Sequence, residues 1–256
     1  MSEREQPTAP SEEWIAGRNA VAEALRAGRP IDRLLVAKGE RSPRLGAILA
    51  QCRERGIPIK ETDPRRMDEL CGPHHQGVAA AAACKDYASP EDILALAARR
   101  GEPPFIVLCD GLEDPHNLGA ILRTAEAAGA HGVIVPRRRS VGLTQTVYKT
   151  SAGAVEYLPV ARVANLAETI RVLKERGLWI FGLDMDGGDW CAADLTGGIG
   201  IVVGAEGQGL SRLVRERCDA ILSLPMKGKI QSLNASVATG IVLYEAARQR
   251  SGIAAR

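Results

Sequence analysis

Residues 105–128 read FIVLCDGLEDPHNLGAILRTAEAA, an apolar run followed by a polar loop and then by apolar residues at helical spacing. The run Phe105 to Cys109 predicts a buried strand, and the spacing from Leu118 to Ala128 predicts a helix. The short apolar stretch 133–135 predicts the next strand. Buried strands that alternate with a helix in this way indicate an α/β fold with a mostly parallel sheet.

The alternation continues to the end of the chain. Further strands are predicted at 178–182, 199–203 and 220–224, and further helices at 166–176 and 233–249. In sheets of this kind, ligands bind beyond the carboxyl ends of the strands. The loops that follow Cys109, Val203 and Leu224 are therefore the places where a functional site is expected.

The first two of these loops combine glycines with polar side chains. In the first, Asn117 is placed to cap the next helix, and Gly119 leaves bare the helix face that also carries Arg123. In the second, three glycines surround Glu206 at a spacing that fits neither a dinucleotide-binding nor a phosphate-binding loop. A carboxylate in such a loop suits a cationic or hydroxyl-rich ligand.

The third loop brings small polar residues to the start of the last helix. Pro225 and Gly228 bend the chain as it leaves the strand, and Ser232, Asn234 and Ser236 follow at alternate positions. Ser232 or Asn234 could serve only as a helix cap, and Ser236 could bond its own backbone. Together with free backbone groups, they could also line a nucleoside-sized pocket.

The region before residue 105 is predicted to contain a tail, a small domain and a linker. Residues 1–13 predict a disordered polar tail without the features of a signal peptide. Residues 14–85 predict a small α/β domain, with Asn19 as a possible helix cap, strands at 34–37 and 57–59, helices at 43–56 and 64–70, and an Ala-rich strand before Cys84. Residues 86–104 predict a linker with one short helix, so that the second domain spans 105–256.

Composition limits the classes of protein that need to be considered. The chain has 256 residues, of which 45% are hydrophobic and 25% charged, which excludes global disorder. Its net charge of +2 means that nucleic-acid binding would depend on a local patch. No uncharged apolar run approaches the ~20 residues of a membrane span. The six scattered cysteines favour reduced, mostly buried thiols over a disulfide framework or zinc site, and the sequence predicts a soluble cytoplasmic protein without a metal.

The chain resembles a known family through three motifs. These are Asn117-x-Gly119-x-x-x-Arg123, Gly204-x-Glu206-x-x-Gly209-x-Ser211 and Leu224-Pro225-Met226-x-Gly228-x-x-x-Ser232-Leu233-Asn234-x-Ser236. Their order and separation resemble those of the SpoU-type 2′-O-ribose RNA methyltransferases of the SPOUT superfamily. The first domain adds Gly17-x-x-Ala20-Val21 and His75-Gln76-Gly77, which makes the chain most similar to members that methylate a guanosine of bacterial 23S rRNA.

The resemblance implies a fold, a cofactor and an assembly. The second domain would be a trefoil-knotted α/β methyltransferase domain, and the first a ribosomal-protein-like RNA-binding domain. The cofactor would be S-adenosylmethionine, held largely through backbone groups of Gly204, Leu224, Met226 and Leu233. The family works as a homodimer with its active site near the subunit interface. The partner would be 23S rRNA, either free or within a ribosomal precursor particle.

The resemblance also implies catalytic roles. Arg123 matches the arginine that the family places at the 2′-OH; because a guanidinium stays protonated, stabilising an alkoxide or holding a phosphate is easier for it than acting as a base. Asn117 would orient the target nucleotide or Arg123, and Glu206 would fix its loop. Ser232, Asn234 and Ser236 would line the site.

RNA contacts are expected from local positive charge. The candidates are Arg137, Arg138 and Arg139 after one strand, together with Lys149, Lys227 and, in the first domain, Arg18. A solvated turn is the simpler interpretation of the arginine run, and a packed histidine is as good an interpretation of His75 as an RNA contact.

Other functions remain open. One is the methylation of tRNA or of another rRNA site by the same chemistry, although the minimal tRNA enzymes lack an N-terminal domain. Another is a non-catalytic RNA-binding protein in ribosome assembly; the presence of Arg123, Glu206 and Asn234 together counts against it. A small-molecule enzyme is disfavoured because the dinucleotide fingerprint is missing.

Overall fold

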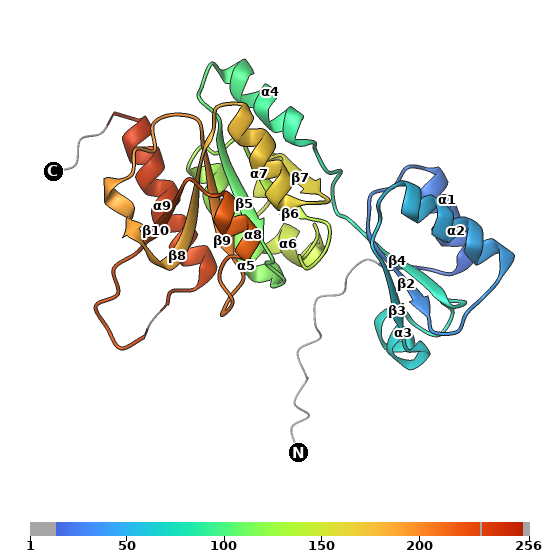
Figure 1. Cartoon of the computed structure of the whole chain (residues 1–256). Helices are drawn as coiled ribbons and strands as arrows, with labels where there is room; N and C mark the ends of the chain where they lie inside the picture. Colours follow the sequence, from blue (N-terminus) through green and yellow to red (C-terminus); the bar gives the residue numbers. More distant parts are fainter. Residues whose placement is uncertain (1–13, 231, 253–256) are drawn as a thin grey trace. The chain divides into compact units, whose positions relative to one another are not determined.

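A computed structural model of the chain describes residues 14–230 and 232–252. The tail predicted at 1–13 lies outside the described residues. Two units are distinguished by their internal contacts (Figure 1). One takes in the described residues up to Asp86 together with Gly142–Thr146, and the other takes in Tyr87–Val141 and the described residues from Val147 onward.

The first unit is a four-stranded sheet covered by helices. Its strands are β1 (Trp14–Ala16), β2 (Ile31–Ala37), β3 (Ile59–Thr62) and β4 (Val78–Ala82), in the order β1-β4-β2-β3. The β2–β3 pair is parallel, and the pairs that β4 makes with β1 and β2 are antiparallel. Helices α1 (Arg18–Arg26) and α2 (Pro43–Glu54) pack on one face, and Met67 of α3 (Pro64–Cys71) packs with Leu35 and Ala79 on the other.

Two local expectations for this unit are wrong. Helix α1 begins two residues earlier than a cap at Asn19 requires, and its N-cap is Gly17, at φ 96°. The strand expected at 57–59 begins only at Ile59, because Pro58 has no N–H to give to the ladder. The carbonyl of Pro58 still accepts a hydrogen bond from the backbone N–H of Leu34 at 2.8 Å.

The second unit confirms the predicted sheet, and every strand pairing in it is parallel. The order is β10-β8-β9-β5-β6-β7. Its strands are β5 (Phe105–Asp110), β6 (Gly132–Pro136), β7 (Val160–Val163), β8 (Trp179–Asp189), β9 (Ile199–Gly204) and β10 (Ala220–Ser223). Its helices are α4 (Pro90–Arg100), α5 (Pro115–Ala127), α6 (Gln145–Thr150), α7 (Leu166–Glu175), α8 (Arg212–Arg217) and α9 (Ala235–Arg250), with short 3₁₀ turns at Ala154–Glu156 and Trp190–Ala192.

Helices cover both faces of this sheet (Figure 1). Helices α4, α7 and α8 share one buried cluster with Ile106 and Leu108 of β5. Val107 and Cys109, which alternate with them and are fully buried, face the side covered by α5 and α9. The segment that the sequence suggests as a linker is therefore partly core: Ile93 of α4 is fully buried in the first of these clusters.

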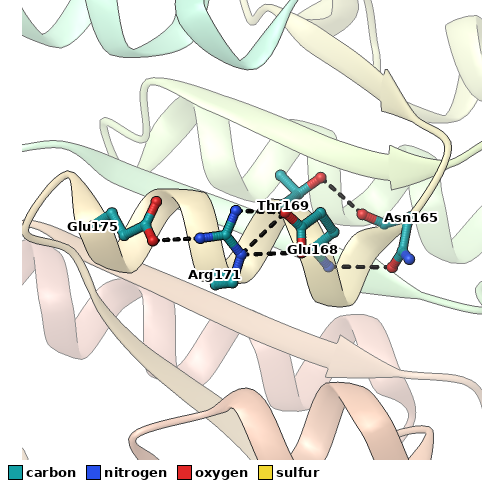
Figure 2. A network of polar contacts seen from close by, with 5 residues as sticks. All are labelled: Asn165, Glu168, Thr169, Arg171 and Glu175. Carbon is teal, nitrogen blue, oxygen red and sulfur yellow. Dashed lines mark hydrogen bonds and ion pairs between the residues drawn. The ribbon is translucent and has the colours of Figure 1, made fainter.

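The exposed face of α7 is held by local polar contacts (Figure 2). Asn165 caps the helix by accepting a hydrogen bond from the N–H of Glu168 at 3.1 Å. Arg171 pairs with Glu168 at 2.6 Å and also with Glu175. Such exposed pairs contribute about 0.3–0.5 kcal/mol each. The helix is attached to the sheet mainly by its buried residue Ile170 and by the leucines on the same side.

None of the six cysteines, all of which lie in the described part of the chain, forms a disulfide. Cys52 and Cys109 are buried, as expected for small core residues, whereas Cys191 is exposed. Burial raises the pKa of Cys109 and Cys218 to about 12, so both remain protonated thiols. Across the described residues, no helix combines the length and the apolar character needed to cross a bilayer.

A buried histidine makes the stability of the second unit depend on pH. His131 has no exposed surface, and its Nδ1 accepts a hydrogen bond from the N–H of Phe105 at 3.0 Å. Its Nε2 lies 3.0 Å from Glu102 Oε2. Burial outweighs this carboxylate and lowers the pKa of His131 below its ordinary value of 6.5.

We expect the free energy of unfolding to fall as the pH falls. The unfolded chain takes up a proton near pH 6.5 that the folded protein does not, so stability is complete above that pH and is lost as the pH drops through the lower folded-state pKa. Urea unfolding from neutral pH to about pH 5 measures it. His131→Gln, which keeps one acceptor and one donor, should flatten the profile, and exposed His116→Gln should not. An unchanged profile for His131→Gln would contradict this account.

Candidate functional site

The site lies at the carboxyl ends of two neighbouring strands. Strands β5 and β9 pair in parallel, with Asp110 opposite Gly204, so the loops after them leave the sheet at the same level. On one side of β5 the sheet continues through β6 and β7, and on the other through β9, β8 and β10. The strand order therefore changes direction between β5 and β9, which is where parallel sheets form ligand-binding crevices.

The first turn of α5 supplies the most buried polar side chain of the site. The sequence suggested that Asn117 caps this helix, but α5 starts at Pro115, and Asp114 is the cap, accepting a hydrogen bond from the N–H of His116 at 3.0 Å. Asn117 thus lies inside the first turn and is only 4% exposed. Its amide is free to reach across to the next loop.

Three residues from three separate loops meet there, and we call them the Asn–Glu–Asn cluster (Asn117, Glu206 and Asn234). Asn117 Nδ2 donates a hydrogen bond to Glu206 Oε1 at 2.8 Å. Asn234 Nδ2 donates to the same oxygen at 2.8 Å and to Asn117 Oδ1 at 2.9 Å. The structure therefore joins the three sequence motifs, which are up to 117 residues apart, through one hydrogen-bonded group.

Asn234 has two roles, because it is also the N-cap of α9. Its Oδ1 accepts hydrogen bonds from the N–H of Ser236 at 2.9 Å, from the hydroxyl of Ser236 at 2.6 Å and from the N–H of Val237 at 3.3 Å. Capping thus fixes the side chain whose Nδ2 contacts Glu206. The helix cap that the sequence offered for Asn234 is confirmed, and its role as a site residue stays a prediction.

The loop that presents Glu206 is closed on itself. Ala205 and Gly209 exchange two backbone hydrogen bonds, at 3.1 and 2.9 Å. Ser211 N–H donates to Asp110 Oδ2 at 2.7 Å, which ties the end of the loop to the end of β5. The three motifs do not include Asp110, although a carboxylate directly after a buried strand is a signal visible in the sequence. Glu206 is exposed, and its Oε2 has no partner among the described residues.

Arg123 is placed on the expected face of α5 but does not contact the cluster. It is exposed and makes no hydrogen bond or ion pair with any described residue. Four residues before it, a Cβ on Gly119 would lie 1.9 Å from Thr150 Oγ1 and 3.0 Å from the backbone nitrogen of Ser151. The bare helix face at Gly119 is therefore occupied by the end of α6, a helix without apolar periodicity that the sequence analysis missed.

The third loop offers an apolar surface with free backbone groups. Leu224 is partly buried, while Met226 is 37% exposed, Leu233 40% and Ile230 75%. Within the described part of the chain, residues 225–230 form no hydrogen bond with another residue. Ser232 is exposed and also lacks a described partner. Apolar side chains beside unpaired N–H and C=O groups can hold a flat ligand that has a polar edge.

Gly204 is also required for the closure of its own loop. A Cβ there would lie 2.2 Å from the carbonyl carbon of Gly209 and 2.3 Å from its oxygen, so a side chain would enter the loop's own backbone before it reached a ligand.

We expect Gly204→Val to open this loop and lower the free energy of unfolding by about 1–3 kcal/mol, the usual result of overpacking. Urea unfolding and hydrogen exchange at 204–211 measure the two effects. Gly228→Val is the control, because nothing lies within 4 Å of a Cβ at that position. If Gly204→Val and Gly228→Val had the same free energy of unfolding and the same exchange rates, the proposed close packing at Gly204 would be contradicted.

Basic side chains surround the first and third loops. Arg138 and Arg139 are exposed in the turn after β6, and this turn is bonded to the first loop through Val141 N–H and Leu112 C=O at 2.8 Å. Lys149 of α6 and Lys227 of the third loop are exposed. Arg137 is partly buried and follows β6 directly. Its carbonyl accepts a hydrogen bond from Arg162 Nη2 at 3.3 Å.

In the first unit, Arg18 is held by internal contacts. Its Nη2 pairs with Glu40 Oε1 at 2.7 Å, and its Nε donates to the carbonyl of Gln76 at 3.0 Å. Its role as an RNA contact stays a prediction, with Glu40 neutralising its charge in the structure. His75 is buried and accepts a hydrogen bond from Gly77 N–H at 2.9 Å, as a packed histidine does. Among the described residues, no group of three side chains could hold a metal ion.

Comparison with known families matches both units. Residues 104–244 match the SpoU rRNA Methylase family, and residues 14–88 match the domain described as RNA 2′-O ribose methyltransferase substrate binding. A Bacillus subtilis (strain 168) protein assigned to the TrmH family of tRNA/rRNA methyltransferases is 43% identical over 242 residues, which cover 94% of this chain and 97% of that protein.

Solved structures of enzymes from the same family have a similar fold. The SpoU methyltransferase AviRb from Streptomyces viridochromogenes, in complex with AdoMet, is 28% identical, with a TM-score of 0.59 over 93% of this chain and 90% of that one. The TrmH/SpoU tRNA modifying enzyme of A. aeolicus is 31% identical, with a TM-score of 0.54, but covers only 59% of this chain and 77% of its own.

Proposed function

The chain belongs to the SpoU rRNA methylase family, and we propose that it transfers a methyl group from S-adenosylmethionine to the ribose 2′-OH of a guanosine in 23S rRNA. The Asn–Glu–Asn cluster is the observation that carries this proposal. It joins one residue from each family motif at the carboxyl edge of the sheet. A cluster of this kind can orient a polar group of a ligand, which is what transfer to one particular hydroxyl requires.

The residues of the third loop fit the proposed cofactor. Met226 and Leu233 expose apolar side chains, and the backbone of residues 226–230 offers hydrogen-bonding groups that have no partner among the described residues. An adenine ring needs an apolar surface and a few backbone partners for its polar edge. Leu224 and Gly204 would complete the site from the ends of β10 and β9. Bound there, S-adenosylmethionine supplies a methyl group that its sulfonium has already activated.

The protein's own task is then to hold the ribose hydroxyl and to ease the loss of its proton. Arg123 suits this role because no described residue neutralises it, so its guanidinium can bind a developing alkoxide or the neighbouring phosphate. The free Oε2 of Glu206 can accept a hydrogen bond from the ribose or from Arg123. Ser232 and Ser236 would line the same pocket.

The first unit favours ribosomal RNA over tRNA as substrate. Residues 14–88 match a substrate-binding domain of RNA 2′-O methyltransferases, whereas the tRNA enzyme of A. aeolicus covers 59% of this chain, too little to match both units in full. Arg137, Arg138, Arg139, Lys149 and Lys227 would bind the RNA backbone, with Arg18 a weaker candidate. Methylation of tRNA or of another rRNA site is the alternative.

We further propose that the enzyme is a homodimer with a knotted second domain. Val237 and Tyr244 of α9, on one face of the helix, are 52% and 55% exposed. A second copy that covers this surface would lie beside the third loop and therefore near the cofactor. Light scattering tests the dimer: wild type should have twice the monomer mass, and Tyr244→Glu should shift it toward monomer.

The substrate is tested by comparing unmodified RNAs. Purified protein is incubated with labelled S-adenosylmethionine and either 23S rRNA or a tRNA pool, with precursor particles as a third substrate. Label in 23S rRNA, free or within the particle, supports the proposal. Label in tRNA alone overturns the choice of substrate. A protein that binds the cofactor and labels none of the three would be the non-catalytic RNA-binding protein of the alternative.

A further inference from the structure

A bulge in β8 brings an acidic side chain against the loop that presents Glu206. In the β8–β10 pairing, Gly182 lies opposite Ile221 and Gly188 lies opposite Leu222. Two consecutive residues of β10 thus pair with residues of β8 that are separated by five others, so the segment 183–187 bulges from that edge. Gly187 fixes the end of the bulge, because a Cβ there would lie 2.6 Å from the backbone of Ile221.

Asp184, at the start of this bulge, packs on the Glu206 loop. A Cβ on Gly209 would lie 3.3 Å from Asp184 Oδ2, so the carboxylate rests directly over this glycine. Gly209 is in the left-handed region at φ +65° and closes the loop through its bonds with Ala205. The side chain of Asp184 is 20% exposed, and its Oδ1 accepts the N–H of Met185 at 2.8 Å.

A single arginine holds Asp184 in this position. Arg215 is on α8, the helix that follows the Glu206 loop (Figure 1). Its Nη1 pairs with Asp184 Oδ2 at 2.7 Å, and its Nη2 pairs with Asp186 Oδ1 at 2.8 Å. Asp186 is 73% exposed, so its pair with Arg215 is the more solvated of the two.

We propose that Arg215 is a positioning residue: by holding Asp184 against Gly209, it fixes the loop that presents Glu206 to Asn117 and Asn234. Two further anchors secure the C-terminal end of the loop, namely the buried Leu210 and the bond from Ser211 to Asp110. Asp184, held by Arg215, contacts the loop at Gly209, directly before these anchors. None of the three sequence motifs contains Asp184 or Arg215.

The inference rests on the proposed methyl transfer only for its kinetic readout. We expect Arg215→Gln to lower kcat about tenfold or more, as displacing a positioned group does, while KM for RNA changes less than about twofold. Arg215→Lys, which can pair with one carboxylate, should retain an intermediate kcat. Arg212→Gln is the matched control, since Arg212 is on the same helix and, among the described residues, pairs only with Glu216, at 2.9 Å.

Two further comparisons identify Asp184 as the partner through which Arg215 acts. Asp184→Asn should lower kcat as much as Arg215→Gln, and the double variant should be no worse than either single one. Asp186→Asn should remain close to wild type. The proposal would be overturned if the losses in kcat of the two single variants multiplied in the double variant. It would also be overturned if Arg212→Gln lowered kcat as much as Arg215→Gln.

Hydrogen exchange provides a readout that does not require activity. The amides of Ala205 and Gly209 are bonded to each other's carbonyls and should exchange faster in Arg215→Gln, but not in Arg212→Gln. Unchanged exchange at both amides in Arg215→Gln overturns the positioning role. A wild type that transfers no methyl group would instead refute the proposed function, and the exchange experiment would still decide whether Arg215 fixes the loop.

Discussion

Arg123→Ala is expected to lower the rate of methyl transfer by about 10²–10³-fold or more, the usual cost of removing a group that stabilises developing charge. Binding of S-adenosylmethionine should stay nearly unchanged, because the proposed cofactor pocket is in the third loop. Stability should also be unaffected, since Arg123 is exposed and contacts no described partner. Single-turnover methyl transfer and calorimetric titration of the cofactor measure the two effects.

Two control variants separate charge from geometry at this position. Arg123→Lys keeps the positive charge but loses the planar fork of donors, and we expect an intermediate rate. Arg99→Ala removes an exposed arginine of α4 and should leave the rate unchanged. Substantial turnover in Arg123→Ala would remove this residue from the catalytic role.

Glu206→Ala should impair both activity and stability. It removes the acceptor shared by the amides of Asn117 and Asn234, and the buried Asn117 is left with an unsatisfied donor. We expect a loss of about 1–3 kcal/mol in the free energy of unfolding, together with a loss of about 10²-fold in methyl transfer from misplacement of the loop. Urea unfolding and single-turnover kinetics measure the two losses.

Glu206→Gln is the matched variant for this position. Its amide oxygen can still accept from both asparagines, so the stability should return to near wild type. Activity should stay low, because the carboxylate charge and the free Oε2 acceptor are both gone. If Glu206→Gln regained full activity, the role of Glu206 would be confined to holding the loop. If Glu206→Ala unfolded like wild type, the cluster would not contribute as the geometry indicates.

Much of the second unit could be predicted because its strands are buried on both faces. Runs such as Phe105 to Cys109 and Ile199 to Val203 have no polar residue to interrupt them, and the structure places both within parallel strands. Helix α6 was missed because its residues 145–150 have no apolar period, so only its packing against Gly119 shows its role. A helix of this kind is recognised only from its tertiary contacts, which local sequence does not predict.

In the candidate site, too, some features could be predicted from local sequence and others depend on tertiary contacts. The motifs predicted which loops matter, but not the bonds between them, because the contacts of Asn117 depend on a helix that begins at Pro115 instead of Leu118. The close approach of Gly209 to Gly204 could not be predicted, because it follows from the closure of the loop. Arg215 and Asp184 were missed altogether, since they meet only because β8 bulges beside β10.

The measurement that tests the central claim most directly is the chemical position of the transferred methyl group. Unmodified 23S rRNA is labelled with the purified protein and methyl-labelled S-adenosylmethionine, and is then hydrolysed in alkali. A methyl group on a ribose 2′-oxygen blocks cleavage at that nucleotide, so the account predicts label in an alkali-stable dinucleotide that begins with guanosine. Label released in mononucleotides would place the methyl group on a base and contradict it.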